Sequence, residues 1–254
     1  MGSAMLRGWL AHGILPERFH IVDPVAENLP AGVSVYRSPQ EVARRFDIVV
    51  LGIKPQMLPS LAPDIAQLLS PDALVISILA GTTFETLSAA FPPARVIRLM
   101  PNLAAAIGKS PLAVFAPHAG EAARTEIAAL LTPLGSVIWI DDESQMDAVT
   151  ALAGSGPAFV YRFMDALIDG GVAAGLPRDI AAQLAISMTE GAALLAASSS
   201  HKPAELAVQV TSPGGTTAAG LAVLDANGAL TALIAQTLRA ARDRGTELAT
   251  GEAK

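Results

Sequence analysis

The chain has 254 residues, 52% of them hydrophobic, and a formal net charge of −6. This length is enough for one large domain or for two smaller domains with buried cores. Because cysteine is absent, disulfides, a thiol nucleophile and thiolate metal sites are excluded. The acidic balance without a basic run disfavours a nucleic-acid surface, so we expect no nucleic-acid partner.

The mean hydropathy of +0.46 raises the question of a membrane protein. The longest apolar segments, 158–175 and 180–198, contain recurring polar residues such as Arg162, Asp165 and Glu190. These residues are costly in a lipid span and suit helices packed within a protein or an oligomer. No signal-peptide pattern is recognisable. We therefore expect a soluble, cytoplasmic protein without a membrane partner.

The first elements predict part of a dinucleotide-binding unit. Residues 1–10 are expected to form a helix, and 19–22 a strand that ends at Asp23. These elements match the second half of such a unit, with Gly2 as the last glycine of its G-x-G-x-x-G loop. Its first strand and first two glycines do not precede this helix. We expect a start codon assigned too late or a truncated chain, whereas a protein that truly begins at Met1 should bind the cofactor poorly. The alternative is that residues 1–3 are a cloning scar.

Strands then alternate with helices up to residue 140. Ser38 and Thr82 begin capping-box patterns that predict helix starts, and another helix is expected over 120–132. Continuous apolar, largely β-branched runs are typical of strands buried on both faces of a parallel sheet. They occur at 47–53, 74–79, 95–99, 112–115 and 136–140. This alternation predicts an α/β fold with a doubly wound sheet.

The carboxyl ends of these strands predict a ligand crevice. Ligands of open parallel sheets bind outside these ends, which here are 52–55, 80–82 and 100–102. Lys54 directly follows a strand and would face this crevice, although a solvated loop lysine is the alternative.

From residue 144 onward the pattern is wholly helical, which places a domain boundary between residues 143 and 144. Residues 1–143 would form the α/β domain and 144–254 an all-helical domain. The apolar faces of these helices are too extensive for one thin layer, so we expect a dimer in which they interlock.

A glycine-rich stretch, Thr211-Ser212-Pro213-Gly214-Gly215-Thr216-Thr217, opens one of the predicted helices. The first N–H groups of a helix lack intrahelical partners and lie in positive potential, so they can bind a small anion. A turn that merely caps the helix is the alternative.

Other candidate groups favour structural roles. The four histidines, His12, His20, His118 and His201, share no metal or triad spacing, and we expect no metal site. Glu143 and Asp147 lie four residues apart, as on a solvated helix face, but Glu143 stays a candidate because it lies at the domain junction.

Five motifs in chain order resemble those of the pyrroline-5-carboxylate reductase family, and the resemblance spans essentially the whole chain. They are Met1-Gly2-Ser3-Ala4-Met5, Gly52-Ile53-Lys54-Pro55, Arg98-Leu99-Met100-Pro101-Asn102, and the segments 147–158 and 203–225. The resemblance implies a Rossmann domain followed by an all-α dimerisation domain, in a homodimer or a ring of dimers. It also implies hydride transfer from NADPH or NADH to the cyclic imine pyrroline-5-carboxylate, giving proline. The site would lie between one subunit's cofactor domain and its partner's helices.

Particular residues take roles through this resemblance. Thr217 would be the catalytic residue that hydrogen-bonds the ring nitrogen. The N–H groups around Gly214, Gly215 and Thr216 would hold the substrate carboxylate, with Ser212 and Glu143 nearby. The residues that match cofactor-contacting positions are Gly2, Asp23, Gly52, Ile53, Lys54, Pro55, Ala80, Gly81 and Asn102.

Asp23 bears on the choice of cofactor. Many members of the family have a small residue there, near the adenosine 2′-phosphate. A carboxylate accepts hydrogen bonds from a free ribose hydroxyl and repels a phosphate, so we expect NADH to be preferred over NADPH.

Two alternatives to this function stay open. A β-hydroxyacid dehydrogenase would need a catalytic lysine that residues 157–200 do not contain. A non-catalytic paralogue that only dimerises is the other alternative.

Overall fold

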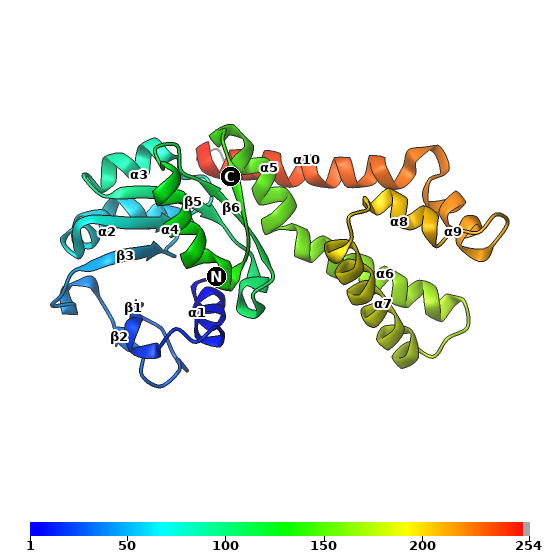
Figure 1. Ribbon diagram of the computed structural model, residues 1–254, viewed down its shortest axis with the longest axis horizontal. Coiled ribbons are helices and arrows are strands. Elements are labelled where there is room, and N and C mark those ends of the chain that lie inside the picture. Colours follow the sequence, from blue (N-terminus) through cyan, green and yellow to red (C-terminus); the bar gives the residue numbers. More distant parts are fainter. Residues whose placement is uncertain (251–254) are drawn as a thin grey trace. The chain divides into compact units, whose positions relative to one another are not determined.

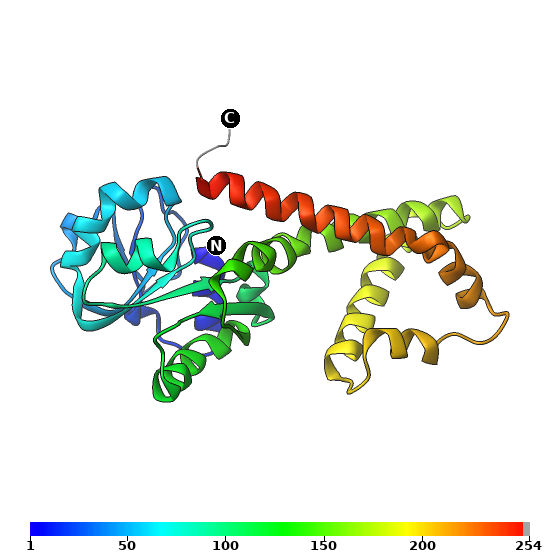
Figure 2. The same ribbon diagram turned by 90° about the horizontal axis from the view of Figure 1, so that it is seen from above.

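The computed structural model describes residues 1–250, with side chains described for residues 1–247. The chain divides into two compact units. Unit 1 consists of Met1–Gly154 and Ala241–Lys254, and unit 2 is Ser155–Ala240. Unit 1 contains strands and helices, whereas the described residues of unit 2 form helices and turns alone (Figures 1 and 2).

Unit 1 contains two sheets of neighbouring strands. The larger has the order β3-β4-β5-β6-β7, formed by Phe46–Leu51, Leu69–Ser77, Arg95–Met100, Ser110–Phe115 and Gly135–Ile140. The smaller pairs β1 (His20–Val22) with β2 (Ser34–Tyr36). All pairs are parallel except β5 with β6. The predicted strands are confirmed, but β2 and the antiparallel pair were not predicted.

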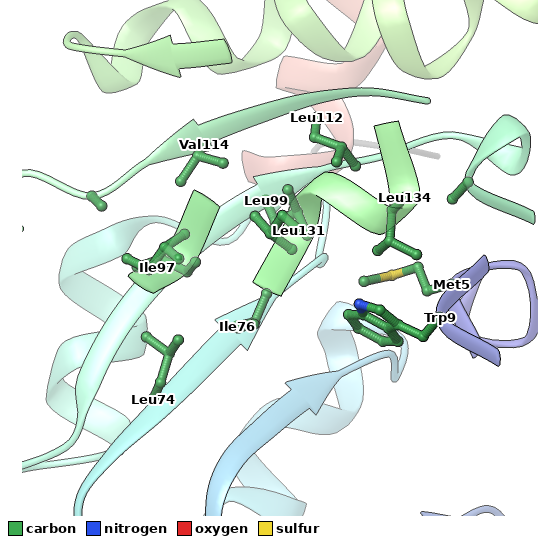
Figure 3. Packing of buried hydrophobic residues seen from close by; sticks show 13 residues of the cluster. Met5, Trp9, Leu74, Ile76, Ile97, Leu99, Leu112, Val114, Leu131 and Leu134 are labelled. Atoms are coloured by element: carbon green, nitrogen blue, oxygen red, sulfur yellow. The ribbon is translucent and has the colours of Figure 1, made fainter. Parts of the chain in front are cut away.

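Helices cover both faces of the larger sheet, which confirms the doubly wound architecture. Leu74 and Ile76 of β4 pack in one cluster with α1 (Gly2–Ala11) and α4 (Glu121–Leu131) (Figure 3). Val75, between them, packs in a second cluster with α2 (Leu58–Gln67) and α3 (Phe84–Ala90). Alternate residues of a strand point to opposite faces, so a continuous apolar run is buried on both sides.

The two sheets share no backbone ladder in the part of the chain that the structure describes. Helix α1 and strand β1 lead to Asp23 as predicted. A side-chain contact links the strand starts, since the ring centroids of His20 and Phe46 are 4.9 Å apart. Ile48 of β3 is 42% exposed, as expected for an edge strand.

Two predicted helix starts are wrong in detail. Ser38 makes no side-chain cap and precedes only a 3₁₀ turn. There the Glu41 carboxylate instead accepts a hydrogen bond from the Arg37 N–H at 2.8 Å. Helix α3 is capped by the Thr83 hydroxyl, which accepts from the Thr86 N–H at 3.2 Å, rather than by Thr82. Capping-box spacing thus locates the region of a helix start but not the capping residue.

The first segment of unit 1 ends with α5 (Met146–Val149) and a π-helical turn, Thr150–Gly154. The helices of unit 2 are α6 (Gly156–Ala173), α7 (Arg178–Ser198), α8 (Pro203–Gln209) and α9 (Thr216–Leu224), and α10 (Ala229–Thr250) extends from unit 2 into unit 1. Arg178–Ser198 and Thr216–Glu247 are long and apolar enough to cross a membrane by length and composition alone, which is weak support for a span.

Candidate functional site

Five residues form one row across the larger sheet. Leu51 pairs with Ser77, Ser77 with Arg98, Arg98 with Phe115, and Phe115 with Ile140. All but Arg98 are the last residues of their strands. The segments that follow these four strands therefore all begin at the level of Arg98, and because β6 and β7 run opposite to β3 and β4, the two pairs of segments continue from that level in opposite directions.

The predicted cofactor loops follow β3 and β4. Ile53 packs against the apolar cluster of α2 and α3, and Pro55 opens a 3₁₀ turn. Lys54 is exposed, and no carboxylate pairs with it among the described residues. Gly81 has a φ of +72°, which favours glycine. A Cβ on Gly52 would meet its nearest neighbour at an ordinary 3.9 Å, so sterics do not require glycine there.

Asn102, a predicted cofactor residue, is buried and engaged within the protein. Its Oδ1 accepts from the Ala104 N–H, and its Nδ2 donates to the Ala153 carbonyl, both at 2.9 Å. Its own N–H donates to the Ser110 hydroxyl at 2.9 Å. The side chain therefore fastens the end of β5 to the π-helical turn.

The start of the dinucleotide unit offers polar groups at two places. The Gly2 and Ser3 N–H groups have no acceptor among the described residues, at the start of α1. Oδ1 of Asp23 accepts from the Val25 N–H at 2.9 Å, which leaves Oδ2 open. Arg37, at the end of β2, donates to the Ala26 carbonyl at 2.9 Å and so holds the loop that follows Asp23.

Glu143 lies in a network that joins three segments. Its Oε1 accepts from the Phe84 N–H at 2.5 Å and from Arg98 Nη1 at 2.6 Å. The neighbouring Asp142 accepts from the Ser144 hydroxyl and N–H, which lowers the pKa of the Asp142 carboxyl. The ion pair is largely shielded, with side-chain exposures of 7% for Arg98 and 29% for Glu143.

Sequence reasoning gave Arg98 no role of its own, although a signal was available. Arg98 lies between Ile97 and Leu99 in a strand predicted to be buried on both faces. A charge at such a position requires a partner. The partner is Glu143, 45 residues away.

The glycine-rich turn lies in unit 2. Gly214 has a φ of +69°, and the Gly215 N–H donates to the Ser212 carbonyl at 3.0 Å. A Cβ on Gly215 would lie 2.5 Å from the Ser212 hydroxyl oxygen and 3.2 Å from its carbonyl oxygen, so a larger residue there would make the Ser212 side chain move. The N–H groups of Gly214, Thr216 and Thr217 have no acceptor among the described residues.

The hydroxyl of Thr217 is also free of partners in the described part of the chain, and the residue is exposed. By contrast, Thr211 and Thr237 donate their hydroxyls to the carbonyls of Ala207 and Leu233, at 2.6 and 2.9 Å. Helical threonines commonly bond back in this way. Thr217 cannot use an earlier turn of its helix, because α9 begins at Thr216. Its hydroxyl is therefore available to a ligand.

Comparison with known proteins identifies relatives over nearly the whole chain. The family described as "Pyrroline-5-carboxylate reductase dimerisation" matches residues 143–248, and "NADP oxidoreductase coenzyme F420-dependent" matches residues 1–81. The pyrroline-5-carboxylate reductase of Pseudomonas aeruginosa is 39% identical, over 98% of this chain and 93% of the relative. That of Pisum sativum is 41% identical, over 98% and 92%.

Solved structures agree with this likeness. A pyrroline-5-carboxylate reductase from Coxiella burnetii has a TM-score of 0.88 and 29% identity, and covers 97% of this chain and 94% of that one. The Plasmodium falciparum pyrroline carboxylate reductase, with NADP bound, has a TM-score of 0.83 and 27% identity, with 98% and 94% covered.

Proposed function

Because this chain belongs to the pyrroline-5-carboxylate reductase family, we propose that it reduces pyrroline-5-carboxylate to L-proline and binds this substrate at the turn 211–217. NAD(P)H supplies the hydride that adds to the imine carbon. The observation that carries the proposal is the Thr217 hydroxyl, which has no partner among the described residues and stands beside unoccupied N–H donors.

The turn suits a carboxylate next to a ring nitrogen. We assign the carboxylate to the N–H groups of Gly214, Thr216 and Thr217, because in this structure the Gly215 N–H already holds the turn closed on Ser212. The helix start adds positive potential there. The Thr217 hydroxyl then hydrogen-bonds the ring nitrogen. A protonated imine is already electrophilic, so the protein has mainly to orient the reactants.

The cofactor residues fit a dinucleotide. The free N–H groups of Gly2 and Ser3 can donate hydrogen bonds to a pyrophosphate oxygen, and the Lys54 ammonium can bind a phosphate or a hydroxyl. Asp23 keeps one carboxylate oxygen for a ribose hydroxyl. We therefore propose that NADH is preferred over NADPH. Gly52, Ile53, Pro55, Ala80, Gly81 and the backbone of Asn102 complete the assigned loops.

We assign residues 1–143 to the cofactor domain and residues 144–254 to dimerisation and substrate binding. The family match over 143–248 supports this boundary and a homodimer. The matched segment includes the apolar helical stretches Arg178–Ser198 and Thr216–Glu247, so burial against a second copy accounts for their exposed side chains. We further propose that such dimers assemble into a ring, which light scattering tests. We also propose a cytoplasmic location, which cell fractionation tests.

The alternatives have less support. The relatives over nearly the whole chain are pyrroline-5-carboxylate reductases, whereas the segment 157–200 lacks the lysine that a β-hydroxyacid dehydrogenase needs. A protein that only dimerises has no use for a substrate turn with free donors.

An assay of NADH oxidation with pyrroline-5-carboxylate tests this function. We expect turnover that depends on the imine, proline as the product, and a higher kcat/KM with NADH than with NADPH. A stable dimer that binds neither cofactor and shows no turnover would favour the non-catalytic alternative. Equal or better use of NADPH would contradict only the role assigned to Asp23 and would leave the proposed reductase function intact.

A further inference from the structure

We propose that Arg98 is a positioning residue that fixes the carboxylate of Glu143 and, with it, the start of α3. The inference rests on the proposed function and on the assignment of Glu143, by family resemblance, to a position near the substrate. Arg98 is 6% exposed and lies in the row where the other four strands end.

Burial explains why this arginine needs its partner. Removing a guanidinium from water is unfavourable unless a carboxylate and further hydrogen bonds compensate. Glu143 provides the compensation at 2.6 Å. Arg98 extends from a central strand that is anchored on both sides, by β4 and by β6. Its backbone is therefore held by ladders on both sides.

The bonds to Glu143 define one orientation of its carboxylate. Oε1 accepts from Arg98 and from the Phe84 N–H, whereas Oε2 has no partner among the described residues. Oε2 is thus the atom that remains for a ligand. Phe84 is the first residue of α3 and follows the Ala80–Gly81 loop, so the same oxygen also anchors the loop assigned to the cofactor. Arg98 thereby sets the substrate-side carboxylate and the cofactor loop at one level of the sheet.

The same strand carries a matched control. Arg95 pairs with Glu126 at 2.9 Å, but both side chains are exposed, at 43% and 56%. Exposed pairs of this kind contribute little to stability. An R95M variant therefore removes an arginine from β5 and an ion pair from the surface without touching Glu143.

A double-mutant cycle in the full-length dimer tests the inference. We expect R98M to lower kcat about 10- to 100-fold through loss of orientation, with R98K recovering much of it and R95M unchanged. Because Arg98 acts through Glu143, the R98M/E143Q double variant should lie within about twofold of E143Q alone. Losses that multiply, or an R98M variant with normal kcat, would overturn the proposal. Melting temperatures show whether R98M still folds. If it does not, R98K replaces R98M in the comparison with the parent and R95M.

Amide hydrogen exchange at Phe84 gives a readout independent of turnover. Loss of a fixed acceptor should speed this exchange about 10-fold or more in R98M, but not in R95M. If the parent fails to reduce pyrroline-5-carboxylate, the proposed function fails, and the exchange result still decides whether Arg98 fixes Glu143. Unchanged exchange at Phe84 in R98M would overturn the positioning role.

Discussion

The two units differ in how they bury apolar surface. Of the buried hydrophobic residues among the described side chains, only Ala181 and Ala185 belong to unit 2. Unit 2 instead exposes large apolar residues: Val160, Tyr161, Phe163, Leu176, Ile180, Leu184, Ile186, Met188, Leu194, Leu195, Val208, Val210, Val223, Leu224, Leu233 and Ile234. Unit 1 thus has a core of its own. Unit 2 needs a second apolar surface, because exposed patches of this extent are typical of interfaces.

Polar groups show the same difference. In unit 1 the side chains of Asn102 and Glu143 are bonded within the protein, and Asp23 uses one oxygen for its own loop. In unit 2 the donors of Gly214 and Thr217 have no partner among the described residues. Among the residues proposed for the cofactor, bonded side chains thus occur beside the free N–H groups of Gly2 and Ser3, whereas the turn proposed for the substrate leaves its hydroxyl and most of its N–H donors free.

The largest effect is expected at the free hydroxyl of unit 2. Thr217→Ala should lower turnover roughly 10- to 1000-fold, through loss of orientation and of one transition-state hydrogen bond. Steady-state rates with pyrroline-5-carboxylate measure this. Thr237→Ala is the matched control, because its hydroxyl is bonded to the Leu233 carbonyl. A Thr217→Ala rate within about twofold of the parent would contradict the assignment.

The exposed apolar surface of unit 2 predicts a second difference. Leu184→Glu, at a side chain that is 55% exposed, should raise the dissociation constant of the dimer by about 100-fold, because a charge would be buried without a partner. Ile107→Glu, at a 72% exposed residue of unit 1, should leave it unchanged. Sedimentation velocity over a concentration series distinguishes the two. If both substitutions changed the dissociation constant equally, the exposed apolar side chains of unit 2 would not be distinguished from those of unit 1 as a dimer interface.

Local sequence patterns predicted the elements of both units but not the pairing of distant segments. The β-branched runs at 47–53 and 74–79 specify buried strands because burial on both faces requires apolar residues throughout. The three residues of β2 are too short for any such pattern. Nothing local shows that β6 runs antiparallel, although this reversal brings Glu143 to Arg98. The free donors of the turn were predicted, whereas the engagement of Gly215 depends on its observed geometry.

Asp23→Ser tests the proposed role of Asp23, in unit 1, in the choice between NADH and NADPH. Removal of the carboxylate should shift the ratio of kcat/KM for NADPH over NADH upward by about 10-fold, since repulsion of the 2′-phosphate is lost. Glu27→Gln removes a charge from the same loop and controls for net charge. Parallel assays with both cofactors give the ratio. The expectation fails if both substitutions shift it equally.

The smallest effect concerns stability and is confined to unit 1. Burial and then the Arg44 guanidinium lower the pKa of His20 from its ordinary value of 6.5. Arg44 Nη1 lies 3.3 Å from His20 Nε2 and can only donate, so Nε2 is unprotonated, and Nδ1 faces the Tyr36 hydroxyl at 3.2 Å. The unfolded chain therefore takes up a proton at higher pH than the folded chain does. The stability due to His20 is complete above 6.5 and is lost as pH falls from 6.5 through the folded pKa.

His20→Phe should keep the ring packing and flatten this part of the pH profile. Urea unfolding at about pH 7.5 and about pH 5.5 measures the difference between parent and variant, which cancels the contribution of other groups such as Glu126. His201→Gln, at a half-exposed side chain, is the control. Since the pKa of His20 is lowered, the parent must lose more stability on acidification than His20→Phe does. A parent that loses less would mean that the imidazolium is stabilised beside Arg44, which like charges at that separation oppose.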